Sequence, residues 1–238
     1  MNSTRKIAVM TGVVFIIATA TSLLASALVG DLTGANYLAG LSANTNRVAA
    51  GALLYLVGHL ACAGIALLIY PVLKKWNAGL ALGSVIFRTI ESVFYMVGVV
   101  CLLSLSTLGQ QFTSAAAADN TTLQAIGGSL VSLHDHAGLV GVFAFCLGAF
   151  MYYALFFRSR LIPRWLSGWG IVAIILMTAA CVLSLFSGNR ITSYIPLAAP
   201  IGVQEMVLAV WLIVKGFDPS VIASKSGKAE TDEPLSAL

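Results

Sequence analysis

The stretch that decides the fold is AGLALGSVIFRTIESVFYMVGVVCLLSL, residues 78–105, which is apolar almost throughout but carries Arg88 and Glu91 near its middle. It is longer than the roughly 20 residues that an α-helix needs to cross a bilayer. A charged side chain at the bilayer centre costs about 2.5–3.5 kcal/mol on insertion scales. Two charges three residues apart on one helix face therefore indicate the interior of a helix bundle, and a candidate site.

The composition of the whole chain agrees with membrane insertion. Of its 238 residues, 59% are hydrophobic and only 9% are charged, and the mean hydropathy is +0.94. Soluble domains carry about 25% charged residues. The net charge of +4 is small, and the basic residues lie in short connections, which argues against a nucleic-acid partner. The cysteines lie inside apolar segments without metal-ligand spacing, so they predict neither a disulfide nor a metal site.

Six apolar segments are each long enough to span a membrane. They cover Ile7–Val29, Val48–Tyr70, Gly79–Leu105, Leu133–Phe157, Trp165–Phe186 and Pro196–Gly216. We expect helices, because lipid cannot satisfy the backbone of other open structures and the segments are too long for barrel strands. The predicted fold is an all-α, polytopic transmembrane bundle of six helices over residues 1–217. A polar tail, residues 218–238, is expected to be disordered.

Lysine and arginine are distributed unequally between the two sides of this bundle. Ten lie on one side, Arg47 and Arg190 lie on the other, and Arg88 lies within the membrane. Because cytoplasmic connections of membrane proteins carry the excess of basic residues, we expect both termini to be cytoplasmic. We expect a multi-pass protein of the cell (plasma) membrane, with the lipid bilayer as its main partner. Glycine and alanine are abundant on several helix faces, so no single face marks an oligomer interface.

Two segments and the Arg88–Glu91 span carry a family resemblance. Residues 158–170, RSRLIPRWLSGWG, form a positive turn followed by the opening of a helix, and residues 195–217, IPLAAPIGVQEMVLAVWLIVKGF, form the last span. Over nearly its whole length up to Phe217, the chain resembles the bacterial membrane family catalogued as domain of unknown function 4386. The resemblance implies an α-helical integral membrane protein and brings no activity with it.

Four ionisable residues fall at similar depth on three of the predicted spans: His59, Arg88, Glu91 and Glu205. At three- and four-residue spacing, Tyr55 shares a helix face with His59, and Tyr95 shares one with Glu91. Small residues on the same faces allow close helix approach, and polar residues turn away from lipid. We therefore expect both faces to line one interior, with Glu205 opposite them.

Counting charges in this set leaves one carboxylate in excess. Arg88 remains charged, and it faces two carboxylates, Glu91 and Glu205. The extra carboxylate must be protonated, share Arg88, or lie beside protonated His59. Two interpretations remain open. The set binds or translocates a small molecule or a proton at the membrane midplane, or it locks helix packing in a non-catalytic scaffold or regulatory protein.

His134, Asp135 and His136 open the fourth span at the outer surface and are weaker candidates for a contact at an outer mouth. Side chains two residues apart on a helix point about 200° apart, so these histidines could share a metal ion only in an extended segment. His59 lies too deep to pair with either in a haem site. Hydrolase motifs such as H-E-x-x-H and G-x-S-x-G are absent. We therefore expect no cofactor, and an intramembrane enzyme or haem protein is only a third alternative.

Overall fold

The computed structural model describes residues 3–114 and 119–232, with side chains as far as Lys225. Within these ranges six helices are long and apolar enough to cross a membrane: α1 (Ser3–Val29), α3 (Thr45–Leu73), α4 (Ala78–Ser114), α5 (Asn120–Ser159), α6 (Arg164–Ser187) and α7 (Ile195–Val214). The same ranges contain no strand. The predicted all-α class with six spanning helices is thereby confirmed, and by length and composition the chain is a multi-pass membrane protein.

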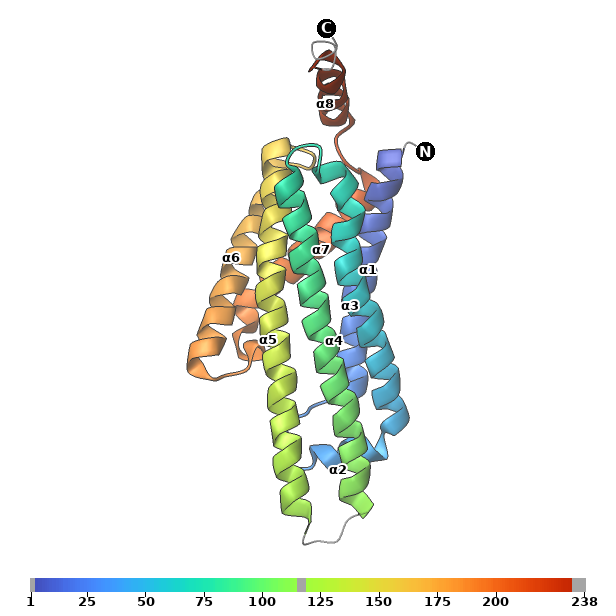
Figure 1. Ribbon diagram of the computed structural model, residues 1–238, viewed down its shortest axis with the longest axis vertical. Coiled ribbons are helices and arrows are strands. Elements are labelled where there is room, and N and C mark those ends of the chain that lie inside the picture. Colours follow the sequence, from blue (N-terminus) through green and yellow to red (C-terminus); the bar gives the residue numbers. More distant parts are fainter. Residues whose placement is uncertain (1–2, 115–118, 233–238) are drawn as a thin grey trace.

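The spanning helices form a closed ring. Each packs against its neighbours along the chain, and α7 returns to pack against α1. In Figure 1, α1, α3, α4 and α5 run along the long axis, whereas α6 is inclined to it, and both termini lie at the same end of the molecule. The interior of the ring is therefore enclosed by all six spans.

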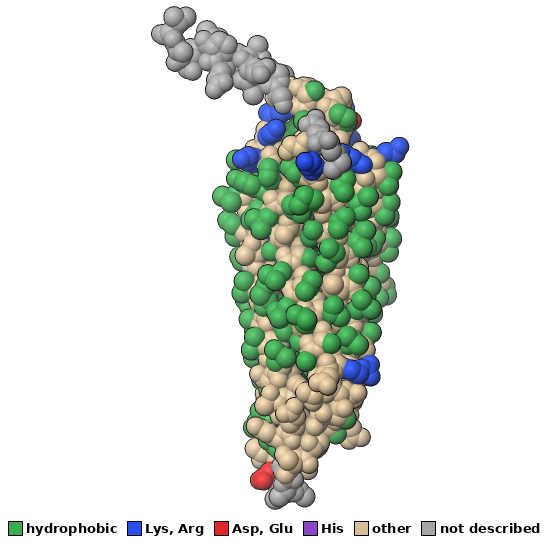
Figure 2. Space-filling model, turned by 90° about the vertical axis from the view of Figure 1, so that its right-hand side faces the viewer, with side chains coloured by type: hydrophobic (Ala, Val, Ile, Leu, Met, Phe, Trp, Pro, Cys, Tyr) green, Lys and Arg blue, Asp and Glu red, His purple; other side chains and the backbone are tan. Residues whose placement is uncertain are grey.

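Basic side chains gather at the end that holds the termini, as Figure 2 shows, and a band of hydrophobic side chains follows below them. We call this the basic end, and the other the outer end. The basic end carries Arg5, Lys6, Lys74, Lys75, Arg158, Arg160, Arg164 and Lys215. Many large hydrophobic side chains are exposed on the spans, as a lipid-facing surface requires.

The outer end differs from the sequence-based expectation. The predicted spans Gly79–Leu105 and Leu133–Phe157 imply a connection over residues 106–132, but α4 continues to Ser114 and α5 begins at Asn120. Residues 115–118, part of that connection, lie outside the described residues. The short helix α2 (Tyr37–Ala43) packs against α4 and forms a second apolar cluster there. This cluster contains Leu38, Leu41, Leu105 and Leu108. Burial of this cluster stabilises helical turns at the outer end that are not needed to cross a bilayer.

A further helix, α8 (Pro219–Asp232), follows the last span, and the expected disorder of the tail stays a prediction. Asp218 accepts hydrogen bonds from the backbone N–H and the hydroxyl of Ser220, and Pro219 occupies the first helical position. Both features are typical of a helix start. Residues 233–238 lie outside the described residues. The division into a domain, residues 1–217, and a separate tail stays a prediction.

Candidate functional site

Arg88 and Glu91 form an ion pair within α4, buried inside the ring. Arg88 Nη1 lies 2.9 Å from Glu91 Oε2, and both side chains are no more than 3% exposed. Neither of these two atoms has a hydrogen-bond partner of good geometry. The contact is therefore held by the attraction between the two charges and not by an aligned hydrogen bond. A buried charge is tolerated only when it is compensated. The pair therefore satisfies the charge of both groups but leaves hydrogen-bonding capacity unused.

Arg88 also touches both neighbouring helices. Its Nε donates to the Cys62 carbonyl oxygen of α3 at 3.3 Å, and its guanidinium lies 4.8 Å from the centre of the Phe145 ring on α5. Gly148 lets the α5 backbone approach, because a Cβ there would lie 3.1 Å from Arg88 Cγ and 3.2 Å from the Arg88 backbone nitrogen. The arginine is thus held at the meeting of three helices.

Glu205 enters the same interior from α7 and has no ion-pair partner within 4.0 Å among the described residues. Its Oε1 accepts a hydrogen bond of 3.4 Å from the Tyr152 hydroxyl on α5. It is also close enough to Arg88 for their charges to interact. The structure therefore brings Arg88, Glu91 and Glu205 into one charged group, and Glu205 is the carboxylate that arginine does not contact directly.

Beside Glu205 lies a polar contact that the sequence interpretation missed. The Tyr153 hydroxyl donates to Gln204 Oε1, and Gln204 Nε2 donates to the Leu166 carbonyl oxygen at 3.0 Å. These bonds tie α5, α6 and α7 together next to the carboxylate. Two features of the sequence could have indicated this contact: a glutamine next to a glutamate in an apolar span, and the adjacent tyrosines Tyr152 and Tyr153.

His59 occupies an aromatic setting rather than the ion-pair group. Its ring stacks on Tyr55 at 5.4 Å between ring centres and lies 4.9 Å from the ring centre of Tyr95 on α4. Neither ion pair in the described residues involves His59. Its backbone carbonyl accepts the Ser92 hydroxyl at 2.7 Å, which fixes α3 against α4. Tyr55 and His59 share one face of α3, but among the described residues no hydrogen bond or ion pair joins His59 to Arg88 or Glu205.

A cavity of about 800 Å³ opens at the outer end and reaches toward this aromatic group. Its polar wall includes Ser132, His134, Asp135, His136, Asn189 and Arg190. Tyr55 and Leu102 also line it, on α3 and α4. Tyr55 thus both borders the cavity and stacks on His59, which places the histidine next to the cavity wall.

The three outer candidates all line this cavity, and each has a different partner. His134 Nδ1 lies 2.9 Å from the Gly98 carbonyl oxygen, so Nδ1 is the protonated donor. His136 Nδ1 pairs with the Ser132 hydroxyl at 3.2 Å, and Asp135 forms an ion pair of 2.6 Å with Arg190. Among the described residues, no group of three metal-ligating side chains could hold an ion. The segment is helical, so the two histidines turn to different partners.

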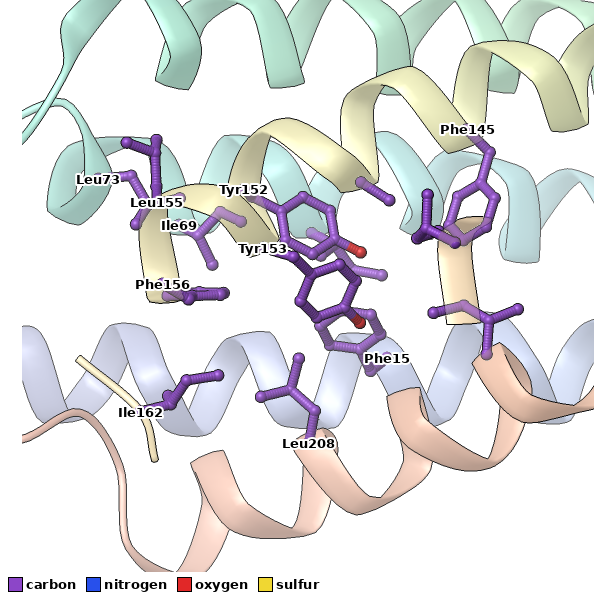
Figure 3. Close-up of a cluster of buried hydrophobic side chains, with 14 of the residues drawn as sticks. Phe15, Ile69, Leu73, Phe145, Tyr152, Tyr153, Leu155, Phe156, Ile162 and Leu208 are labelled. Carbon is purple, nitrogen blue, oxygen red and sulfur yellow. The ribbon is translucent and has the colours of Figure 1, made fainter. Parts of the chain in front are cut away.

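Between the charged group and the basic end, the interior is filled by large side chains. Figure 3 shows Tyr152, Tyr153 and Phe156 of α5 among side chains of the other helices. Leu73, Phe156, Ile162 and Leu208 are each no more than 1% exposed. The described structure thus combines a cavity at the outer end with close apolar packing toward the basic end.

A comparison with protein families decides where this chain belongs. The sequence model of one family matches residues 10–216, which include nearly all of the six spans. The chain belongs to the family described as Domain of unknown function (DUF4386). The DUF4386 match confirms the resemblance seen in the sequence, and it ends before α8.

For this DUF4386 protein, neither the curated proteins nor the solved structures gave a match. Membership of this family carries no activity with it.

Proposed function

We propose that this protein binds a small polar molecule or carries protons between the outer cavity and the charged group at the membrane midplane. The observation that carries the proposal is a spatial series of polar side chains that leads from the outer cavity toward the charged group. His134 at the cavity wall is close enough to His59 for their charges to interact, and His59 contacts Tyr95. Tyr95 in turn lies close enough to Glu91 for such an interaction.

The last part of this series is Glu91, Arg88 and Glu205. A group with two carboxylates and one arginine must hold one proton, or one other positive charge, to be neutral. Glu205, whose described contact is a hydroxyl, is the group that gains or loses that charge most readily. Intramembrane ionisable residues of this kind mark proton or substrate pathways in many membrane proteins.

The proposal includes an orientation and a location. The basic end faces the cytoplasm, both termini are cytoplasmic, and the outer cavity opens to the opposite side of a bacterial cell membrane. The excess of basic residues at one end supports this orientation.

A second candidate function is a scaffold or regulatory protein in which the cluster only fixes helix packing. The observation in its favour is the tight burial of Arg88 and Glu91 within one helix. In that case the outer cavity would have no connection to the charged group, and Glu205 would only anchor Tyr152.

Proton flux into vesicles separates these functions. We expect vesicles that contain the full chain and a trapped pH dye to acidify faster than empty vesicles under an imposed membrane potential. Glu205→Gln should reduce this rate to that of empty vesicles, because glutamine keeps the shape but cannot release a proton, and His59→Ala should reduce it too. The control, Asp119→Asn, removes a carboxyl group in the exposed outer connection and should leave the rate unchanged.

If both site variants keep every pH-dependent or ligand-dependent signal of the unmodified protein, the midplane site is not functional and the scaffold is favoured. If the unmodified protein carries no protons, the same variants are compared for binding of small polar molecules. A loss of binding in Glu205→Gln would then support the small-molecule form of the proposal.

A further inference from the structure

A second cavity, of about 540 Å³, lies at the basic end, far from the charged group. It is formed where the connection from α5 to α6 meets the end of α7. Its floor is apolar, because Leu161, Ile162 and Phe217 line it and are each no more than 6% exposed. We call this the basic groove.

Three cations line the basic groove: Arg160, Arg164 and Lys215. All are exposed, and none has a carboxylate partner within 4.0 Å among the described residues. Asp218 is the only carboxylate in the lining. Hydrogen bonds from Ser220 lower the pKa of Asp218, so it stays negative. The groove therefore carries two positive charges in excess and suits an anion.

The backbone places one of these cations at a position where arginine is unusual. Arg160 ends α5 in the left-handed conformation, with φ of 61°, and its N–H donates to the Phe156 carbonyl oxygen. Glycine is the usual residue at such a helix end. Next to it, α6 begins at Arg164 without a side-chain cap, so its positive dipole end also faces this region.

Aromatic side chains on the lipid-facing side adjoin the cations. Arg164 lies over the ring of Phe157 at 5.4 Å, and Phe157 is 38% exposed. Trp165, which is 57% exposed, meets Trp211 of the groove wall edge to face at 6.3 Å. Tryptophan prefers the level of the lipid headgroups. The cations of the groove thus lie at headgroup level, next to a surface that acyl chains would cover.

We propose that the basic groove binds the phosphate headgroup of an anionic phospholipid, with Arg160, Arg164 and Lys215 around the phosphate and the lipid chains against Phe157 and Trp165. A phospholipid fits better than a soluble anion because the cations adjoin exposed aromatic surface. The inference does not depend on the function of the midplane group, which lies at a different depth.

Quenching of tryptophan fluorescence by lipids with brominated chains tests this proposal. The full chain is reconstituted in phosphatidylcholine vesicles, and brominated phosphatidylglycerol or brominated phosphatidylcholine replaces part of the lipid. We expect the protein to prefer phosphatidylglycerol on the order of fivefold, the contribution of one basic side chain at an anionic membrane surface. The double variant Arg164→Gln/Lys215→Gln should bring the preference close to one.

Matched variants separate the groove from general attraction to the basic end. Lys74→Gln/Lys75→Gln removes two charges at the same end but outside the groove, and should keep the preference. Arg164→Lys should also keep it. The proposal is overturned if the unmodified protein shows no preference or if both double variants lose it equally. Relief of quenching by millimolar inorganic phosphate would likewise overturn it, by showing a site for a soluble anion.

Discussion

Replacing Arg88 with leucine is expected to lower the melting temperature of the protein in detergent by about 6–20 °C. Removing one partner of a buried ion pair costs about 3–5 kcal/mol, because the other charge is left uncompensated. For a chain of this size, each kcal/mol shifts the melting temperature by about 2–4 °C. In Arg88→Leu, Glu91 loses its 2.9 Å partner and Glu205 loses the only nearby positive charge of its group.

The double variant Arg88→Leu/Glu91→Leu should recover part of this loss, since it removes both charges of the pair. Thr89→Leu, an exposed neighbour on α4, should leave the melting temperature nearly unchanged and serves as the control. An unchanged melting temperature in Arg88→Leu would mean that Arg88 faces water, which contradicts its buried position.

Gly148→Leu is expected to lower the melting temperature by about 2–12 °C. A side chain at Gly148 would press on the Arg88 backbone and on Phe87, where a Cβ would already lie 3.2 Å from Phe87 Cβ. Overpacking of a filled interior costs about 1–3 kcal/mol, and each kcal/mol shifts the melting temperature by about 2–4 °C. The clash would separate α4 from α5 at the depth of the ion pair.

Gly138→Leu on the same helix is the matched control, because a Cβ at Gly138 meets nothing within 4 Å. It should not lower the melting temperature. Equal effects of the two substitutions would show that the close approach at Gly148 does not determine how α4 and α5 pack.

Much of the fold was predictable because lipid allows few solutions. In lipid, six long apolar runs can satisfy their backbone hydrogen bonds only as helices. The number and type of the spanning elements could therefore be predicted from the sequence. The lengths of α4 and α5 could not be predicted in the same way. Their outer ends are supported by contacts with α2, which a hydropathy pattern does not reveal.

The candidate site was predictable in its members more than in its contacts. Helix spacing placed Arg88 and Glu91 on one face, and the structure pairs them. Spacing could not show that the His59 ring would contact Tyr95, because that contact depends on how α3 and α4 meet. Gln204 was missed because the search for candidate residues rested on charge and glutamine is uncharged. Its hydrogen bonds to α5 and α6 nevertheless fix the helices beside Glu205.

The proposed function requires that water enters from the outer end as far as the aromatic group beside His59. It is tested most directly by the reaction of single cysteines with a membrane-impermeant maleimide in intact cells. The native cysteines are first replaced with alanine: Cys62, Cys101, Cys146 and Cys181. Single substitutions are then compared at Tyr55 in the cavity wall, at Val57 on the lipid-facing side of α3, and at Leu73 near the basic end.

We predict that Tyr55→Cys reacts with the reagent applied from outside the cells, whereas Val57→Cys and Leu73→Cys do not. If Tyr55→Cys does not react at all, the aqueous path to His59 is contradicted. If it reacts only after the cytoplasmic side is opened, the proposed orientation is contradicted.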